Sequence, residues 1–149
     1  MNPVAIELDG VLGDTRPLWR DWLAEVGRRA GIPVERLPAD RAEAAAELDG
    51  LLGNWRALLE RFAEDRAPVY LRPAAEVSAA LRRLTAAGAR LGVFTDAPEE
   101  LARVALAQVG AARRVETVAA GPQALERLLT QLGGDARVVR TRGELTSLA

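Results

Sequence analysis

The chain has 149 residues, of which 49% are hydrophobic and 28% charged, and its formal net charge is −1. This length and composition suit one domain with a buried core, and the charge balance provides no bulk field that would attract nucleic acid or anionic lipid. The sequence has no cysteine, no histidine and no lysine, since all 20 basic residues are arginine. Thiol nucleophiles, Ser–His pairs, histidine-bound metals and lysine Schiff bases are therefore excluded. Carboxylates, hydroxyls, arginines, backbone amides and an oxygen-bound cation remain as sources of chemistry.

The first half of the chain begins with one strand and continues with helices. The apolar segment 3–8 predicts a buried strand that ends at the Asp9-Gly10 turn. Apolar residues at helical spacing predict a helix over 16–30, with Thr15 as its N-cap. Segment 39–52 favours a helix, and the helical spacing resumes from Trp55 after a Gly-Asn break. The three tryptophans at positions 19, 22 and 55 lie at helical spacing, which favours a role in a helical core over a role as a substrate platform.

The second half alternates helices with strands. The pattern predicts a helix that stops at Gly88, strands over 89–95, 115–119 and 136–139, a helix capped by Asp96, and a helix opened by Gly121-Pro122. Alternation of this kind indicates β-α-β units and a parallel sheet covered by helices on both faces. The helical stretch 15–70 interrupts the alternation, so we interpret it as a cap inserted above the carboxyl ends of the strands. Ligands bind at that edge in open α/β sheets.

The opening residues VAIELDGVLGDT resemble the first motif of haloacid dehalogenase-like (HAD-like) phosphohydrolases, a strand that ends in Asp-x-Asp-Gly-Thr/Val-Leu. The resemblance continues through LRPAAEVSAALRRLTAAGARLGVFTDAPEELARVAL, which matches the helix, strand and second motif of that family. It implies a three-layer, Rossmann-like α/β fold, with residues 1–14 and 71–149 as the core and 15–70 as the inserted helical cap. It also implies catalytic roles for Glu7 (nucleophile position) and Asp9 (general acid/base), phosphate binding by Thr95 and Asp96, and Mg²⁺ held at Glu7 and Asp9 if the protein is active.

Three of the four family motifs depart from the pattern. Glu7 stands where the family has its nucleophilic Asp, and the extra methylene displaces the carboxylate by about 1.5 Å, a misplacement large enough to cost roughly 100-fold in rate. Gly121-Pro122 stands where the family has Lys-Pro, and Arg113 or Arg114 would be the substitutes. The fourth motif, which normally supplies Asp ligands for Mg²⁺, has Arg140, Thr141 and Arg142, with Glu144 as the nearby carboxylate.

Each candidate site residue also has an ordinary structural interpretation. Asp9 is equally consistent with turn formation, because Asp-Gly commonly follows a strand. For Glu7 we favour an ion pair with Arg140 or Arg142 over nucleophilic attack. Thr95 and Asp96 are typical capping residues for the next helix, whose N-terminus would also attract an anion.

These departures lead to two function hypotheses and one variant. The first is a catalytically impaired member of the family, a pseudophosphatase, with a binding or regulatory role. The alternative is an active Mg²⁺-dependent hydrolase of small phosphorylated metabolites. In the variant of the first hypothesis, Arg140 and Arg142 hold a phosphorylated molecule or another anion in place of the cation. No segment of the sequence indicates a signal peptide or a membrane span, so we expect a cytoplasmic protein. An exposed sheet edge would allow two copies to form a homodimer.

Overall fold

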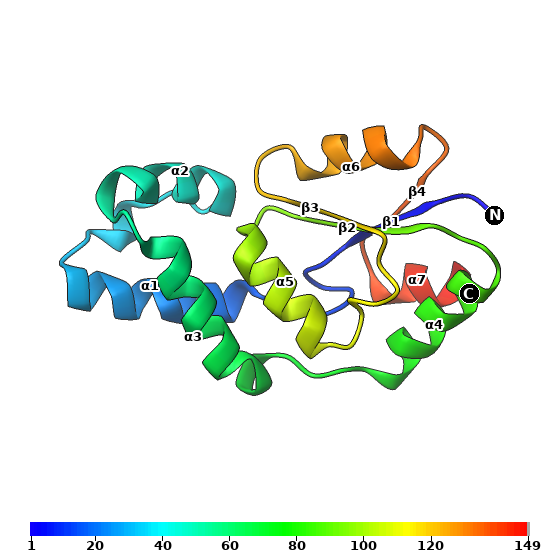
Figure 1. The fold of residues 1–149 in the computed structure, drawn as a ribbon, viewed down its shortest axis with the longest axis horizontal. Coiled ribbons are helices and arrows are strands. Elements are labelled where there is room, and N and C mark those ends of the chain that lie inside the picture. The colour runs from blue at the N-terminus through cyan, green and yellow to red at the C-terminus, as the bar shows by residue number, and fades with distance from the viewer. Residues whose placement is uncertain (149) are drawn as a thin grey trace.

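The computed structural model describes residues 1–148 as a layered α/β fold (Figure 1). The strands are β1 (Val4–Glu7), β2 (Leu91–Thr95), β3 (Thr117–Ala120) and β4 (Arg137–Val139). The helices are α1 (Arg16–Ala30), α2 (Arg41–Leu51), α3 (Trp55–Tyr70), α4 (Ala75–Ala86), α5 (Glu99–Gln108), α6 (Ala124–Leu132) and α7 (Arg142–Leu148), with a short 3₁₀ helix at Val34–Arg36.

The four strands form one parallel sheet in the order β3-β2-β1-β4. The two central strands, β1 and β2, come from segments more than eighty positions apart, and their register pairs Ile6 with Val93 and Glu7 with Phe94. Because all the strands run in the same direction, the residues that follow β1 and β2 meet at one edge of the sheet. This arrangement confirms the predicted parallel α/β architecture.

Alternate residues of the central strands face two different layers of helices. Val4, Ile6 and Val93 belong to the larger core with residues of α4, α5 and α7, whereas Ala5 and Phe94 pack with α6 on the opposite face (Figure 1). Helix α6 lies so close to β2 that a Cβ atom on Gly92 would stand 2.6 Å from the Leu128 side chain. The predicted coverage of both faces is thus correct.

Helices α1, α2 and α3 precede α4 in the chain and form a second apolar core together with Ala97 and Leu101. Its centre is formed by Trp19, Trp22 and Trp55, whose ring centroids lie 5.4 to 6.3 Å apart. The tryptophans are therefore core residues of these helices, as their spacing predicted. The boundaries of the cap, 15–70, remain a prediction.

The structure corrects three local expectations. Thr15 precedes α1, but its side chain makes no capping hydrogen bond there and instead contacts Asp9. Asp96 does not cap α5, because that helix begins at Glu99 after Pro98; its carboxylate accepts a hydrogen bond from the backbone N–H of Arg41, the first residue of α2. Helix α7 was not predicted, because its seven residues are too few for a helical apolar pattern to emerge.

Candidate functional site

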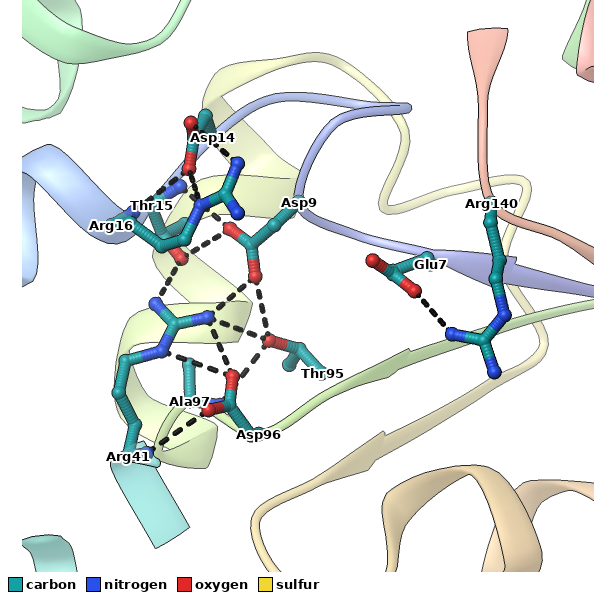
Figure 2. Close-up of polar contacts among 10 residues, drawn as sticks. All are labelled: Glu7, Asp9, Asp14, Thr15, Arg16, Arg41, Thr95, Asp96, Ala97 and Arg140. Carbon is teal, nitrogen blue, oxygen red and sulfur yellow. Dashed lines mark hydrogen bonds and ion pairs between the residues drawn. The ribbon is translucent and has the colours of Figure 1, made fainter. Parts of the chain in front are cut away.

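The predicted site residues gather where β1 and β2 end (Figure 2). Asp9 follows β1, Thr95 is the last residue of β2 and Asp96 follows it. The Thr95 hydroxyl donates a hydrogen bond of 3.1 Å to Oδ2 of Asp9, so two segments distant in the sequence are joined here. The structure thus brings Asp9 and Thr95 together at the carboxyl edge of the sheet.

Both carboxylate oxygens of Asp9 are occupied by hydrogen-bond donors. Oδ1 accepts bonds from the backbone N–H and the hydroxyl of Thr15, each 2.7 Å long. Oδ2 accepts from Thr95 and from the Arg41 guanidinium, at 2.5 Å. Asp9 is only 8% exposed, and a carboxylate at that depth is stable only when it is paired and hydrogen-bonded.

Arg41 supplies the positive charge for this network from α2. Its side chain is 3% exposed, and it pairs with both Asp9 and Asp96. Its Nη1 donates to the Thr15 hydroxyl at 2.6 Å, and its Nε and Nη2 both donate to Oδ1 of Asp96, at 3.0 and 2.8 Å. One guanidinium therefore contacts residues that follow two strands and the residue that precedes α1 (Figure 2).

The surroundings of Asp96 change the pKa of its carboxyl group. Burial raises its pKa, but the hydrogen bonds and the charge of Arg41 together lower it more, so that the pKa of Asp96 lies below its ordinary value. The carboxylate is consequently ionised at neutral pH and pairs with the guanidinium. A phosphate-binding role for Thr95 and Asp96 remains a prediction.

Glu7 lies apart from the Asp9 network (Figure 2). Its Oε2 accepts a hydrogen bond of 2.7 Å from Arg140, which follows β4. The same arginine lies over the ring of Phe94, 5.4 Å from its centroid. The ion-pair interpretation of Glu7 is thus correct, with Arg140 as the partner, and the carboxylate predicted at the nucleophile position is already engaged.

A cavity of about 670 Å³ opens between α2, the ends of β1 and β2, and the segment that leads into α6. Its lining includes five acidic residues: Glu7, Asp9, Asp40, Glu43 and Asp96. The remaining lining residues are mostly small or apolar, among them Ala42, Ala46, Phe94 and Leu125. The cavity thus combines apolar surface with negatively charged side chains.

The side chains at this edge of the sheet do not form a set of ligands that fits Mg²⁺. Within residues 1–148 no three carboxylates or other metal-ligating side chains come together, whereas Mg²⁺ requires near-octahedral oxygen coordination. Arg41 already contacts Asp9, and Arg140 contacts Glu7. The carboxylate proposed for the fourth motif, Glu144, accepts hydrogen bonds from the Arg140 backbone and the Thr141 hydroxyl.

The arginines suggested as substitutes also lie elsewhere. Arg113 and Arg114 are exposed residues of the turn before β3, at the amino-terminal edge of the parallel sheet and thus opposite the site. Arg142 donates to the carbonyl oxygen of Val11 and lies 3.7 Å from Glu76, so it does not join Arg140 in a shared anion site. The geometry therefore supports neither Arg113 nor Arg114 as a replacement for the missing lysine, and it separates Arg142 from Arg140.

Sequence reasoning missed Arg41, the most buried charged residue of the cluster. One signal was present: Asp40 and Glu43 form an N-terminal capping pattern, in which Asp40 accepts from the Glu43 N–H at 2.9 Å. Arg41 therefore occupies the first turn of α2, where the helix dipole disfavours a cation. A basic residue at that position indicates an acidic partner outside the helix, although it does not identify the partner.

No family model and no curated protein sequence matches the chain. Solved structures do resemble it. CbbY from Rhodobacter sphaeroides in complex with phosphate has 15% identity and a TM-score of 0.69 over 93% of this chain and 76% of that one. A HAD phosphatase from Thermococcus onnurineus has 20% identity and a TM-score of 0.59 over 94% and 77%. A dehalogenase with an intermediate complex has 12% identity and a TM-score of 0.52 over 94% and 76%.

The chain has the HAD-like fold, since these structures align over nearly its whole length. At such low identities the likeness concerns the fold, and the site must be judged from its own residues. The helices of residues 1–148 include none that is long and apolar enough to cross a membrane.

Proposed function

We propose that this chain is a HAD-like protein without phosphohydrolase activity, a pseudophosphatase with a binding or regulatory role. The observation that carries the proposal is the engagement of Asp9, whose two carboxylate oxygens accept four hydrogen bonds, one of them from the buried guanidinium of Arg41. A general acid or base must reach the proton it transfers within about 3 Å, directly or through one water. Asp9 has no oxygen free for that contact.

The surroundings of Glu7 support the same proposal. Its carboxylate pairs with Arg140, so nucleophilic attack would first require loss of that ion pair. The side chain is also one methylene longer than the aspartate that the family resemblance predicts there. Glu7 and Asp9 are each paired with an arginine, so neither carboxylate of the first family motif is free for acid–base chemistry.

The test is hydrolysis of a generic aryl phosphate with Mg²⁺ present, in the wild type and in Asp9→Asn. We expect no turnover above background in either protein. Activity that disappears in Asp9→Asn would overturn the proposal. Glu7→Asp serves as a second check, and we expect it to remain inactive because the lysine and the fourth-motif acids are still absent.

The alternative is an active Mg²⁺-dependent phosphomonoester hydrolase. Its specific support is the contact between Asp9 and Thr95 beneath the cavity, together with the fold it shares with a structure described in complex with phosphate. This function requires Arg41 to leave Asp9 during each turnover. Measurable wild-type activity that increases with Mg²⁺ would favour it.

The ligand that the sequence suggested, a small phosphorylated molecule or another anion, can be tested through its charge. The five acidic lining residues exceed the two arginines, Arg41 and Arg140, that pair with them, so the cavity opposes a phosphorylated molecule by charge repulsion. We therefore expect no rise in melting temperature with millimolar phosphate or sulfate. A clear rise would support the anionic ligand that the sequence suggested.

The cytoplasmic location and the homodimer are likewise proposals. The sheet has β3 and β4 as its edge strands, and an unpaired strand edge favours association with a second copy. Size-exclusion chromatography with light scattering would show a mass of twice 16.0 kDa if this edge forms a dimer. A monomer at micromolar concentration would contradict it.

A further inference from the structure

We infer that Asp9, Thr15, Thr95 and Asp96 form a guanidinium-binding site, and that its ligand is the chain's own Arg41, which latches α2 to the edge of the sheet. The inference and the proposed function both concern the carboxylate of Asp9, and this is the only point at which the inference rests on the proposed function. The inference assigns Asp9 and Asp96 the role of binding a guanidinium, and its test measures stability and hydrogen exchange of the backbone rather than turnover.

The geometry matches a guanidinium better than another cation. The donors of Arg41 spread around one plane, and each of its three nitrogens contacts an oxygen: Nε reaches Asp96, Nη1 reaches Thr15, and Nη2 reaches Asp9 and Asp96. The Thr95 hydroxyl lies 3.4 Å from Nη2. A planar fork of this kind exploits several acceptors at once, which a spherical ammonium or metal ion does not.

The charge balance of the site favours a cation. Two carboxylates surround one guanidinium, and Asp9 is buried with it. Removal of the Arg41 side chain would leave two adjacent carboxylates without a counter-charge, one of them shielded from water. A buried ion pair that loses one partner is strongly destabilised for this reason.

The same contacts attach α2 to the sheet. Ala44, Ala45 and Leu48 hold α2 in the apolar core of α1, α2 and α3, which also includes Ala97 and Leu101, before and within α5, and a second core surrounds β1 and β2. Arg41 links the two by its side chain and by its backbone N–H, which donates to Asp96 at 3.0 Å. Arg41 therefore adds polar contacts to the apolar packing that keeps α2 over the cavity.

Chemical rescue tests this inference. In Arg41→Ala we expect the melting temperature to fall by about 10 °C, and ethylguanidinium at about 20 mM to restore a few degrees by occupying the vacated site. Ethylammonium and Mg²⁺ at the same concentration should restore much less. Guanidinium salts denature at molar concentrations, so their denaturing effect is negligible here. Arg16→Ala is the matched control, since Arg16 pairs with Asp14 on the surface, and it should show no rescue.

Hydrogen exchange supplies the structural readout. The backbone amides of α2 should exchange faster in Arg41→Ala and slow again with ethylguanidinium, while those of α6 should stay unchanged. Absence of any rescue, or equal rescue by ethylammonium or Mg²⁺, would overturn the guanidinium assignment. Unchanged exchange in α2 would overturn the latch.

A second variant keeps the inference testable if Arg41→Ala does not fold. Arg41→Lys retains the charge and the apolar stem but loses the fork, so we expect a lower melting temperature than in the wild type and faster exchange in α2. A lysine variant as stable and as protected as the wild type would mean that charge alone suffices, which contradicts a guanidinium-specific site. In either case phosphatase activity is irrelevant to the outcome, so failure here is distinct from failure of the proposed function.

Discussion

Two carboxylates that stand two positions apart, Glu7 and Asp9, have opposite surroundings. Each pairs with an arginine at nearly the same distance, 2.7 Å for Glu7 with Arg140 and 2.5 Å for Asp9 with Arg41. The Glu7 pair has side-chain exposures of 30% and 55%, whereas the Asp9 pair has 8% and 3%. The difference between the two pairs is therefore access to water.

The contribution of an ion pair to stability therefore cannot be judged from the distance between its charged atoms alone. Water screens the Glu7 pair, and such pairs contribute between about 0 and 1 kcal/mol. The Asp9 pair excludes water, so its charges depend on each other and on Thr15 and Thr95. Loss of one partner in a buried pair costs about 3–5 kcal/mol, because the other charge stays buried and unpaired.

Of the two carboxylates, Asp9 should have the larger effect when it is replaced. In Asp9→Asn, Arg41 loses its most buried counter-charge but keeps Asp96, so we expect a loss near the lower end of the range for a broken buried pair, about 3 kcal/mol. Urea denaturation would measure it. A loss below about 1 kcal/mol would show that Asp96 alone neutralises the guanidinium.

A double-mutant cycle would measure the coupling energy within each of the two ion pairs. We expect the coupling energy between Asp9 and Arg41 to exceed about 1.5 kcal/mol, and that between Glu7 and Arg140 to stay below about 1 kcal/mol. Each single and double variant is compared with the wild type by chemical denaturation. Equal coupling in the two pairs would refute the assignment of the difference to solvent exposure.

The pH dependence of stability should report on Asp96. Because its pKa is lowered in the folded protein, its ionised form adds stability above the ordinary pKa, and this contribution disappears as the pH falls through the lowered value. The difference in melting temperature between the wild type and Asp96→Asn should thus be full near neutral pH and shrink below about pH 4. A difference that stays constant down to pH 2 would indicate that the charge of Asp96 is unimportant.

The smallest effect is expected for Glu7. Glu7→Gln removes the charge but retains the volume, and its partner Arg140 remains solvated, so the free energy of unfolding should change by less than about 1 kcal/mol. The change should decrease further in high salt, which screens exposed charges. A loss as large as that of Asp9→Asn would mean that Glu7 is buried in solution.

Much of the architecture was predictable from local patterns. Apolar runs bounded by glycine predicted β1 and β2, and helical spacing predicted the tryptophan core. The ends of elements were less well predicted, since β3 begins at Thr117, two residues later than expected. Helix α7 was not predicted because its seven residues are too few to show a helical apolar pattern. The segments around Glu7, Asp9 and Thr95 were identified by their resemblance to motifs of HAD-like phosphohydrolases, and the parallel strands place the carboxyl ends of β1 and β2 at one edge.

The amino-acid sequence was enough to indicate the kind of fold, to exclude lysine, histidine and cysteine chemistry, and to mark Asp9 and Thr95 as residues that follow or end strands. Which of the 20 arginines pairs with which carboxylate depends on the tertiary structure. Arginine side chains are long and flexible, and their pairing depends on where elements distant in the chain come to lie. The position of Arg41 beside Asp9, 32 residues away in the sequence, follows from the packing of α2 over the sheet edge, and no local pattern contains that information.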